Sequence, residues 1–180
     1  MASPRILAGS AKGRVLKVPP RGTRPSPSRL REALFDIIAF EPRGRFLDLY
    51  AGSGAMGLEA ASRGWDAVCV DLSRSAAAVI RDNARDLGLG VEVLVGDAVA
   101  YAQAHPGEFD VLVAAPPYPD DLLTIFAALL ASGAVGPSGL YVFQHPSEMA
   151  SPTLPAPLAG ADVRRKQYGT NTLTLVRVPA

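Results

Sequence analysis

Three glycines and an acid within ten residues form the part of the chain whose residue types could do chemistry. Gly52, Gly54 and Gly57 follow an apolar stretch in which Asp48 is the only acid. Glycine accepts a positive φ and lets a ligand approach the backbone closely, and a helix that starts after such a turn offers free N–H groups. We therefore expect a loop that binds a nucleotide-like ligand. The expected contacts are Asp48, Tyr50, Ala51, Gly52, Ser53, Gly54 and Met56.

The spacing of the glycines leaves two classes of ligand open. Gly52-x-Gly54-x-x-Gly57 matches the dinucleotide-binding pattern, and Asp71 lies close to the distance of about 20 residues at which a ribose-binding acid is expected. A nicotinamide-dependent oxidoreductase is therefore one interpretation. Asp48 favours another, because a carboxylate at the ligand would repel a pyrophosphate and attract a cation. S-adenosylmethionine carries a sulfonium and an α-ammonium group and no phosphate, so we expect it as the cofactor.

Two more acids come at the ends of apolar stretches further along the chain. Asp71 ends one such stretch, and its carboxylate can accept hydrogen bonds from both ribose hydroxyls of a nucleoside. Asp97 follows another, and it can accept from an adenine amino group, although Gly-Asp is also common where a helix starts. Leu72 and Ala98 would then be apolar walls around the adenine.

A proline turn after the stretch 109–114 is the second candidate for chemistry. Its two prolines fix the backbone and lack N–H groups, so the carbonyls are free to accept hydrogen bonds, and its tyrosine offers a flat face for stacking on a base. An exocyclic base amine is a poor nucleophile, because its lone pair is delocalised into the ring. Acceptors that hold its nitrogen in line with a sulfonium methyl group would favour transfer. The expected catalytic residues are Ala115, Pro116, Pro117 and Tyr118.

Strand and helix patterns alternate along the stretches that carry these residues. This alternation predicts an α/β fold with a mostly parallel sheet and helices on both faces. Ligands in such sheets bind at the carboxyl ends of the strands, where all the candidate residues fall. The predicted strands are 46–50, 67–71, 91–95, 109–114 and 139–144, the helices are 56–63, 75–87, 98–104 and 121–131, an irregular connection covers 146–157, and a closing hairpin pairs 163–168 with 172–178.

Charge is distributed unevenly along the chain. The first 31 residues hold 8 of the 18 basic residues and none of the 17 acids. Residues 5–9 and 14–18 are predicted to form a hairpin around the turn 10–13. A basic segment with structure of its own is typical of an arm that binds a polyanion.

A helix is expected to follow this hairpin. It should cover about residues 29–40, with Ser26 or Ser28 as its cap. Its apolar residues recur at helical spacing, and this pattern leaves Arg29 and Arg31 outside the apolar face.

Length and composition restrict the remaining possibilities. A chain of 180 residues favours one domain with a substantial core, which we divide into a basic extension over 1–40 and a catalytic domain over 41–180. No apolar run approaches 20 residues and no signal peptide is apparent. Cys69 is the single cysteine, so we assign it to the core, and with two distant histidines it makes no metal site. We expect a monomeric, cytoplasmic protein that binds no metal.

Together these motifs resemble the class I S-adenosylmethionine-dependent methyltransferases. More specifically, the chain resembles the RsmD family, whose members are 16S rRNA guanine-N2 methyltransferases. The residues that carry this resemblance are 5–9, Gly13-Arg14, 24–26 and 29–35, together with the cofactor segments 47–60 and 62–64. The resemblance implies a Rossmann-like seven-stranded sheet and methylation of a guanine N2 in the small ribosomal subunit. It assigns RNA contacts to the basic segment. These are Arg5, Lys12, Arg14, Lys17, Arg21, Arg24 and Arg29.

One position departs from the family pattern. The fourth-strand motif usually starts with an acid, as in Asp-Pro-Pro-Tyr, where this chain has Ala115. Losing one positioned polar group can cost about 10²-fold or more in rate. The carbonyls of Ala115 and Pro116 remain as acceptors, and Asp120 or Asp121 could reach the site. Two alternatives stay open, namely an RNA-binding fold with impaired catalysis and an amino-methyltransferase for another substrate, such as DNA adenine or a protein glutamine.

Overall fold

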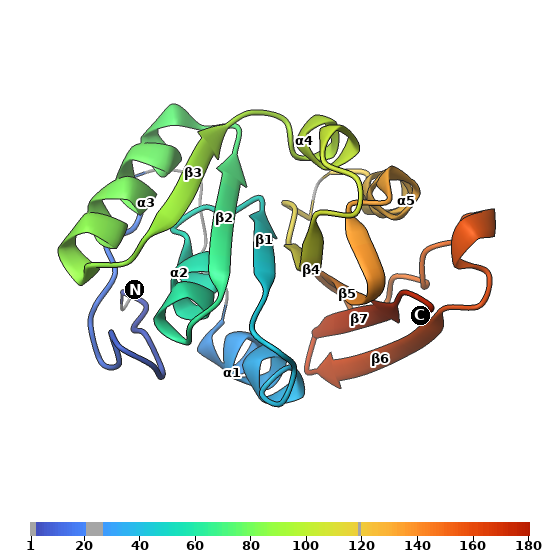
Figure 1. Cartoon of the computed structure of the whole chain (residues 1–180), viewed down its shortest axis with the longest axis horizontal. Coiled ribbons are helices and arrows are strands. Elements are labelled where there is room, and N and C mark those ends of the chain that lie inside the picture. The colour runs from blue at the N-terminus through green and yellow to red at the C-terminus, as the bar shows by residue number, and fades with distance from the viewer. Residues whose placement is uncertain (1–2, 21–26, 119) are drawn as a thin grey trace.

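A seven-stranded sheet with the order β3-β2-β1-β4-β5-β7-β6 runs through the protein (Figure 1). The computed structural model describes residues 3–20, 27–118 and 120–180. The strands are β1 (Arg45–Leu49), β2 (Asp66–Asp71), β3 (Val91–Val95), β4 (Phe109–Ala114), β5 (Val135–Pro146), β6 (Asp162–Tyr168) and β7 (Asn171–Arg177). The helices are α1 (Ser28–Ile37), α2 (Ala55–Ser62), α3 (Arg74–Leu87), α4 (Ala98–Ala104), α5 (Leu122–Ser132) and the short 3-10 helix η1 (Ala156–Leu158).

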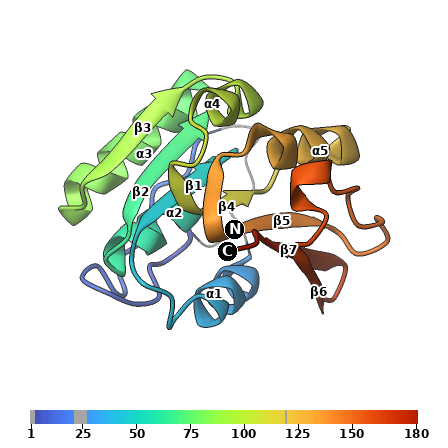
Figure 2. The same cartoon turned by 45° about the vertical axis from the view of Figure 1, so that its right-hand side comes forward.

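The five strands β1 to β5 are parallel, and β7 lies antiparallel between β5 and β6. Helices cover both faces of this sheet (Figure 2). Leu47 and Leu49 of β1 pack with α4 and α5, whereas Phe46 packs with α1 and α2 on the other face. Successive strand residues point to opposite faces, so strands that are covered on both sides must be apolar throughout. The predicted α/β fold with a mostly parallel sheet is confirmed.

The bounds of β3 and β4 agree with the prediction, but β5 is longer than predicted. The sequence Gly-Pro-Ser-Gly at 136–139 resembles a turn, yet it lies within β5. Phe109 pairs with Val135 and Val111 pairs with Leu140, so the register of the two strands shifts at these residues. Glycine and proline are typical of turns and also of irregular positions in strands, so the sequence pattern places the start of this strand too late.

The predicted N-terminal hairpin is present, but its two arms are not regular strands. The described part of this segment has a single antiparallel bridge, between Arg5 and Val15. Backbone hydrogen bonds join the two arms: the N–H of Ile6 donates to the carbonyl of Arg14 at 2.9 Å, and that of Leu16 donates to the carbonyl of Pro4 at 2.8 Å. The N–H groups of Leu7 and Ala8 donate instead to the carboxylate of Glu59 at 2.8 and 3.1 Å, so the pairing is interrupted there. The hairpin is packed onto α2, where its buried side chains contact Ala55 and Leu58. These buried residues are Ile6, Ala11 and Leu16.

Helix α1 also differs from the prediction in its start and in one side chain. Pro27 stands at the N-cap without a side-chain hydrogen bond, and Ser28 is the first helical residue, while Ser26 lies outside the described residues. Arg31, expected outside the apolar face, is fully buried. Its Nη2 donates to the carbonyl of Arg5 at 2.7 Å, and its Nε lies 3.5 Å from Glu59 Oε1.

Glu59 therefore joins three elements through one buried carboxylate. It accepts from the N-terminal segment, faces Arg31 of α1, and pairs with Arg63 at 2.9 Å. Burial lowers the pKa of Arg31, and the charge of Glu59 opposes that shift. Buried charges of this kind need their partner, because an uncompensated charge in the interior is costly.

We expect Glu59→Ala to reduce the free energy of unfolding by about 3–5 kcal/mol, because it leaves the Arg31 charge buried and unpaired. Arg31→Met is the matched control. It should cost less, since Glu59 keeps Arg63 and two backbone N–H donors. Urea unfolding of both variants measures the difference, and an equal or larger loss in Arg31→Met would contradict this assignment.

Candidate active site

The loop after β1 has the backbone shape that its glycines predicted. Gly52 and Gly54 have φ values of 58° and 79°, and Gly54 is the N-cap of α2. Tyr50 also has a positive φ, of 58°. Such a conformation is costly for a residue with a large side chain and is found mainly at functional sites. The strand-to-helix turn is therefore held in a shape that the chain would not adopt by itself.

Two carboxylates hold this loop in place. Asp71, at the end of β2, accepts from the N–H of Gly52 at 2.8 Å and from that of Ser73 at 2.9 Å. Asp48, inside β1, accepts from the N–H of Gly57 at 2.9 Å. Each acid thus binds backbone donors of the loop or of the helix that follows it.

Gly57 allows helix α2 to pack closely against the sheet. A Cβ at this position would lie 2.3 Å from the sulfur of Cys69 and 3.3 Å from the Cβ of Asp48. Only glycine lets α2 approach the sheet this closely. The third glycine of the motif therefore positions the helix and does not need to touch a ligand.

The acids around the loop make it unsuitable for a phosphate. Burial raises the pKa of Asp48 to about 8, the N–H of Gly57 opposes this shift, and the charge of Asp71 adds to it. Burial also raises the pKa of Tyr50 to about 12, with further contributions from Asp97 and Asp120. A cationic group bound here would stabilise the ionised form of Asp48, whereas a pyrophosphate would raise its pKa further.

The ends of β2 and β3 meet beside the loop. The N–H of Gly96 donates to the carbonyl of Asp71 at 3.0 Å. Asp97 is the N-cap of α4, where it accepts from the N–H of Ala100 at 2.8 Å. It therefore has the helix-capping role that the sequence also allowed. Leu72 is 75% exposed, which leaves a large apolar side chain in the open next to Asp71. Ala98 is buried.

The proline turn lies next to the glycine loop, because β4 pairs with β1 up to Leu49 and Ala114. Tyr118 donates its hydroxyl hydrogen to Asn171 at the start of β7. Burial raises the pKa of Tyr118, and a hydrogen bond with Gln144 lowers it. The tyrosine is thus tethered by its hydroxyl, while 43% of the residue remains exposed.

Gln144 is a candidate that the sequence analysis missed. Phe143 pairs with Ala114, so Gln144 lies at the next position of β5, beside Ala115. It is buried, and its Oε1 has no hydrogen-bond partner among the described residues. A buried acceptor without a partner costs about 1–3 kcal/mol. The signal that could have revealed it is one amide directly after the apolar run 140–143.

The basic residues expected to contact RNA are not gathered in one place. Arg21 and Arg24 lie outside the described residues. Arg14 and Lys17 lie at the end of α3, where Arg14 donates to the carbonyl of Asp86 at 3.2 Å and Lys17 pairs with its carboxylate at 3.0 Å. The N-terminal residues with exposed side chains are Arg5, Lys12, Arg14 and Lys17.

Arg29 lies away from these residues, at the start of α1. Its guanidinium carbon is 5.6 Å from the ring centroid of Tyr168, at the end of β6. Tyr168 pairs with Asn171, which holds Tyr118. The structure therefore brings one of the expected RNA contacts close to the proline turn.

Within residues 3–20, 27–118 and 120–180, no group of three or more His, Cys, Asp or Glu side chains could hold a metal ion. No helix in these ranges is long and apolar enough to cross a membrane. Cys69 is a buried free cysteine. Burial raises the pKa of its thiol, and the nearby charges of Asp48 and Asp71 raise it further, so it belongs to the packing of β2.

A mostly parallel sheet that ends in an antiparallel hairpin, with a glycine loop after β1 and an acid after β2, defines a class I methyltransferase. A family model described as "Conserved hypothetical protein 95" matches residues 4–177. The chain therefore belongs to this family, the RsmD family of methyltransferases. This result decides between the two cofactor classes in favour of a methyltransferase.

Individual relatives agree with this assignment. The chain is 32% identical over 157 residues to "Ribosomal RNA small subunit methyltransferase D" of Escherichia coli K12, covering 84% of this chain and 79% of that protein. A solved structure of a hypothetical protein from Thermus thermophilus is 46% identical, with a TM-score of 0.83 and coverage of 98% and 99%. An RNA methyltransferase of Salinibacter ruber in complex with S-adenosylhomocysteine shares the fold at 18% identity, with a TM-score of 0.66 and coverage of 87% and 94%.

We predict that Gly57→Ala destabilises the protein. Alanine in a helix would gain about 1 kcal/mol over glycine, but overpacking against Cys69 costs about 1–3 kcal/mol. Adding Cys69→Ala removes the sulfur that the new Cβ would meet, so the double variant should recover stability. Chemical unfolding of the two single variants and the double variant tests this, and losses that simply add would refute the packing role.

A second prediction concerns the pH dependence of stability. The unfolded Asp48 loses its proton near pH 4, whereas the folded residue keeps it to about pH 8. Over this window the folded state binds more protons, so the stability should fall as the pH rises. Asp48→Asn cannot titrate, and its amide oxygen can still accept from Gly57. Thermal unfolding from pH 5 to 8 should show a flatter curve for this variant; parallel curves would contradict the raised pKa.

Proposed function

We propose that this protein transfers the methyl group of S-adenosylmethionine to the exocyclic N2 of a guanine in the 16S rRNA of the small ribosomal subunit. The observation that carries the proposal is the meeting of an acidic glycine loop and a proline turn at two paired strand ends, Leu49 of β1 and Ala114 of β4. The name of the Escherichia coli relative supports small-subunit rRNA as the substrate. The resemblance to the RsmD family is what points to guanine N2.

The residues at the ends of β1 to β3 fit the cofactor. Asp71 accepts two backbone N–H groups, and a carboxylate has about four lone-pair sites, so it keeps capacity for the ribose hydroxyls. Leu72 provides an exposed apolar wall for the adenine, and Asp97 keeps one oxygen for its amino group. Asp48 is an acid whose ionised form the cationic end of the cofactor would stabilise. The cofactor supplies an electrophilic methyl carbon, and its positive charge is lost on transfer.

The residues after β4 fit the guanine. The carbonyls of Ala115 and Pro116 and the unpaired Oε1 of Gln144 are acceptors for the two N2 hydrogens. Tyr118 is tethered through its hydroxyl, so its ring can stack on the base. Acceptors that hold the amine in line with the methyl carbon use binding energy to orient the nucleophile for attack. The amine can lose its proton to water after attack, so the transfer requires no general base.

Gln144 explains how the site can work without the family acid at position 115. In the described structure its amide oxygen is buried without a partner, and a guanine N–H would satisfy it. The alternative function, RNA binding without turnover, rests on the loss of that acid alone. We further propose that the protein works as a monomer in the cytoplasm, where its substrate is located.

Methyl transfer to small ribosomal subunits tests the proposal. Subunits are isolated from cells that lack this protein, incubated with labelled S-adenosylmethionine, and digested to nucleosides. We expect label in N2-methylguanosine. Label in another nucleoside would overturn the guanine N2 assignment, and no label, with cofactor and subunit both bound, would favour the RNA-binding alternative.

We predict that Gln144→Leu lowers kcat by about 10²-fold, because it removes one positioned acceptor. The KM for S-adenosylmethionine should change little, and the unfolding midpoint should not fall, because the variant removes a buried acceptor that has no partner among the described residues. Ala115→Asp should preserve or raise the rate, and in its background Gln144→Leu should cost much less, because the new carboxylate replaces the amide. Equal losses in both backgrounds would show that Gln144 does not act on the amine.

A further inference from the structure

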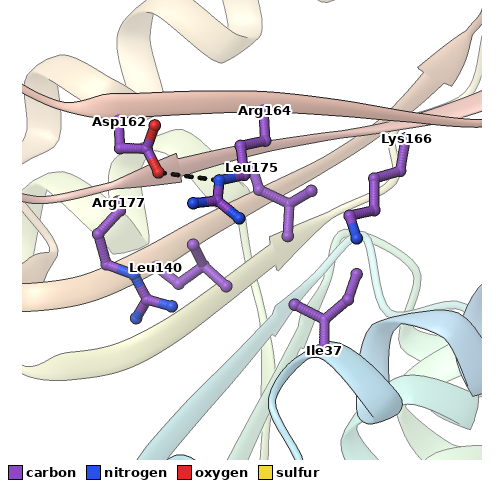
Figure 3. A pocket seen from close by; sticks show the side chains of 7 residues that line it. All are labelled: Ile37, Leu140, Asp162, Arg164, Lys166, Leu175 and Arg177. Carbon is purple, nitrogen blue, oxygen red and sulfur yellow. Dashed lines mark hydrogen bonds and ion pairs between the residues drawn. The ribbon is translucent and has the colours of Figure 1, made fainter.

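A basic surface lies along the edge strand β6, away from the N-terminal segment. The strands β6 and β7 together carry four basic residues and one acid. Three of the bases line a hollow of about 160 Å³ between the sheet and the end of α1 (Figure 3). The hollow is lined by Ile37, Leu140, Asp162, Arg164, Lys166, Leu175 and Arg177. We call Arg164, Lys166 and Arg177 the β6 strip.

Only some of the charged groups of the β6 strip form ion pairs within the described part of the protein. Arg164 pairs with Asp162 at 3.0 Å, and Arg177 pairs with Glu41. Lys166 has no ionic partner among the described residues. Figure 3 shows Arg164 and Lys166 entering the hollow from β6, with Ile37 opposite them on α1. An apolar floor under basic side chains suits their long aliphatic stems and leaves the charged ends in water.

The strip is connected to the proposed methyl-transfer site by the register of the sheet. Lys166 pairs with Leu173, which pairs with Gln144, the neighbour of Ala115. Lys166 and Ala115 are thus three strand spacings apart, or about 14 Å. Nucleotides of one strand are about 3.4 Å apart along a duplex axis, so phosphates within about four nucleotides of a base at Ala115 could reach the strip.

Arg29 and Tyr168 extend this surface toward the mouth of the site. Tyr168 follows Lys166 on the same face of β6, and Arg29 lies over its ring. Tyr168 also pairs with Asn171, to which Tyr118 donates. Basic and aromatic side chains therefore continue from the hollow to the proline turn.

We propose that the β6 strip binds the RNA backbone on one side of the target base, through the phosphates of the neighbouring nucleotides. This proposal rests on the proposed function, because it needs an RNA substrate. Guanidinium and ammonium groups bind phosphate oxygens strongly, and phosphate contacts supply most of the non-specific affinity for nucleic acids. The strip would thereby orient the strand so that its guanine reaches the Oε1 of Gln144 and the ring of Tyr118.

A different role for these charges is protection of the edge strand. Exposed edges of sheets often carry charged residues that prevent pairing with another chain. Acidic side chains would serve that role as well as basic ones, whereas only basic ones bind phosphate. Reversal of the charge therefore separates the two roles.

The test compares Arg164→Glu/Lys166→Glu with Arg164→Gln/Lys166→Gln and with the wild type. Arg81→Glu is the control, because Arg81 is an exposed base on α3 that lies beside β3, at the opposite edge of the sheet. Binding to small ribosomal subunits is measured over a series of salt concentrations. Affinity for S-adenosylhomocysteine and the unfolding midpoint show that each variant is folded.

We expect the Gln double variant to reduce the slope of log affinity against log salt by about 1 for each lost contact. The Glu double variant should bind at least about 10-fold more weakly than wild type, and Arg81→Glu should match wild type. Unchanged affinity and slope in both double variants, with wild-type methyl transfer intact, would overturn the strip alone. Failure of the wild type to bind or methylate the subunits would overturn the proposed function and the strip with it.

Discussion

The site depends on two carboxylates that fix a strained turn. Asp71 binds the N–H of Gly52 and Asp48 binds that of Gly57, so the turn after β1 is held at both ends by neighbouring strands. These hydrogen bonds offset the free energy that the positive φ of Tyr50 costs. A cation bound at the loop would favour the ionised form of Asp48, so the site favours a cofactor with a sulfonium over one with a pyrophosphate.

The turn is also connected to the far side of the protein through α2. This helix begins at Ala55, directly after Gly54, and carries Glu59, whose buried carboxylate binds the N-terminal segment and faces Arg31 of α1. Helix α1 in turn lines the hollow beside the β6 strip with Ile37. Helix α1, which borders the β6 strip, is therefore joined through Glu59 to the helix that follows the cofactor loop.

The sequence was a good guide where local pattern and tertiary environment agree. The bounds of β3 and β4 could be predicted because these strands are bounded by clear turn signals. The helical pattern predicted the wrong environment for Arg31. Its charge can be buried because Glu59, which is distant in the sequence, pairs with it, and a local pattern does not reveal such a partner. Gln144 was overlooked because its unpaired oxygen is visible only once β5 lies beside β4.

The most direct test of the account is a crystal structure of the protein with S-adenosylhomocysteine. The account predicts that both ribose hydroxyls lie within hydrogen-bond distance of Asp71, with the adenine between Leu72 and Asp97. It also predicts that the sulfur faces the turn at Ala115, so that a methyl group on it would point toward Gln144. A ribose that makes no contact with Asp71, or a sulfur directed away from Ala115, would contradict the account.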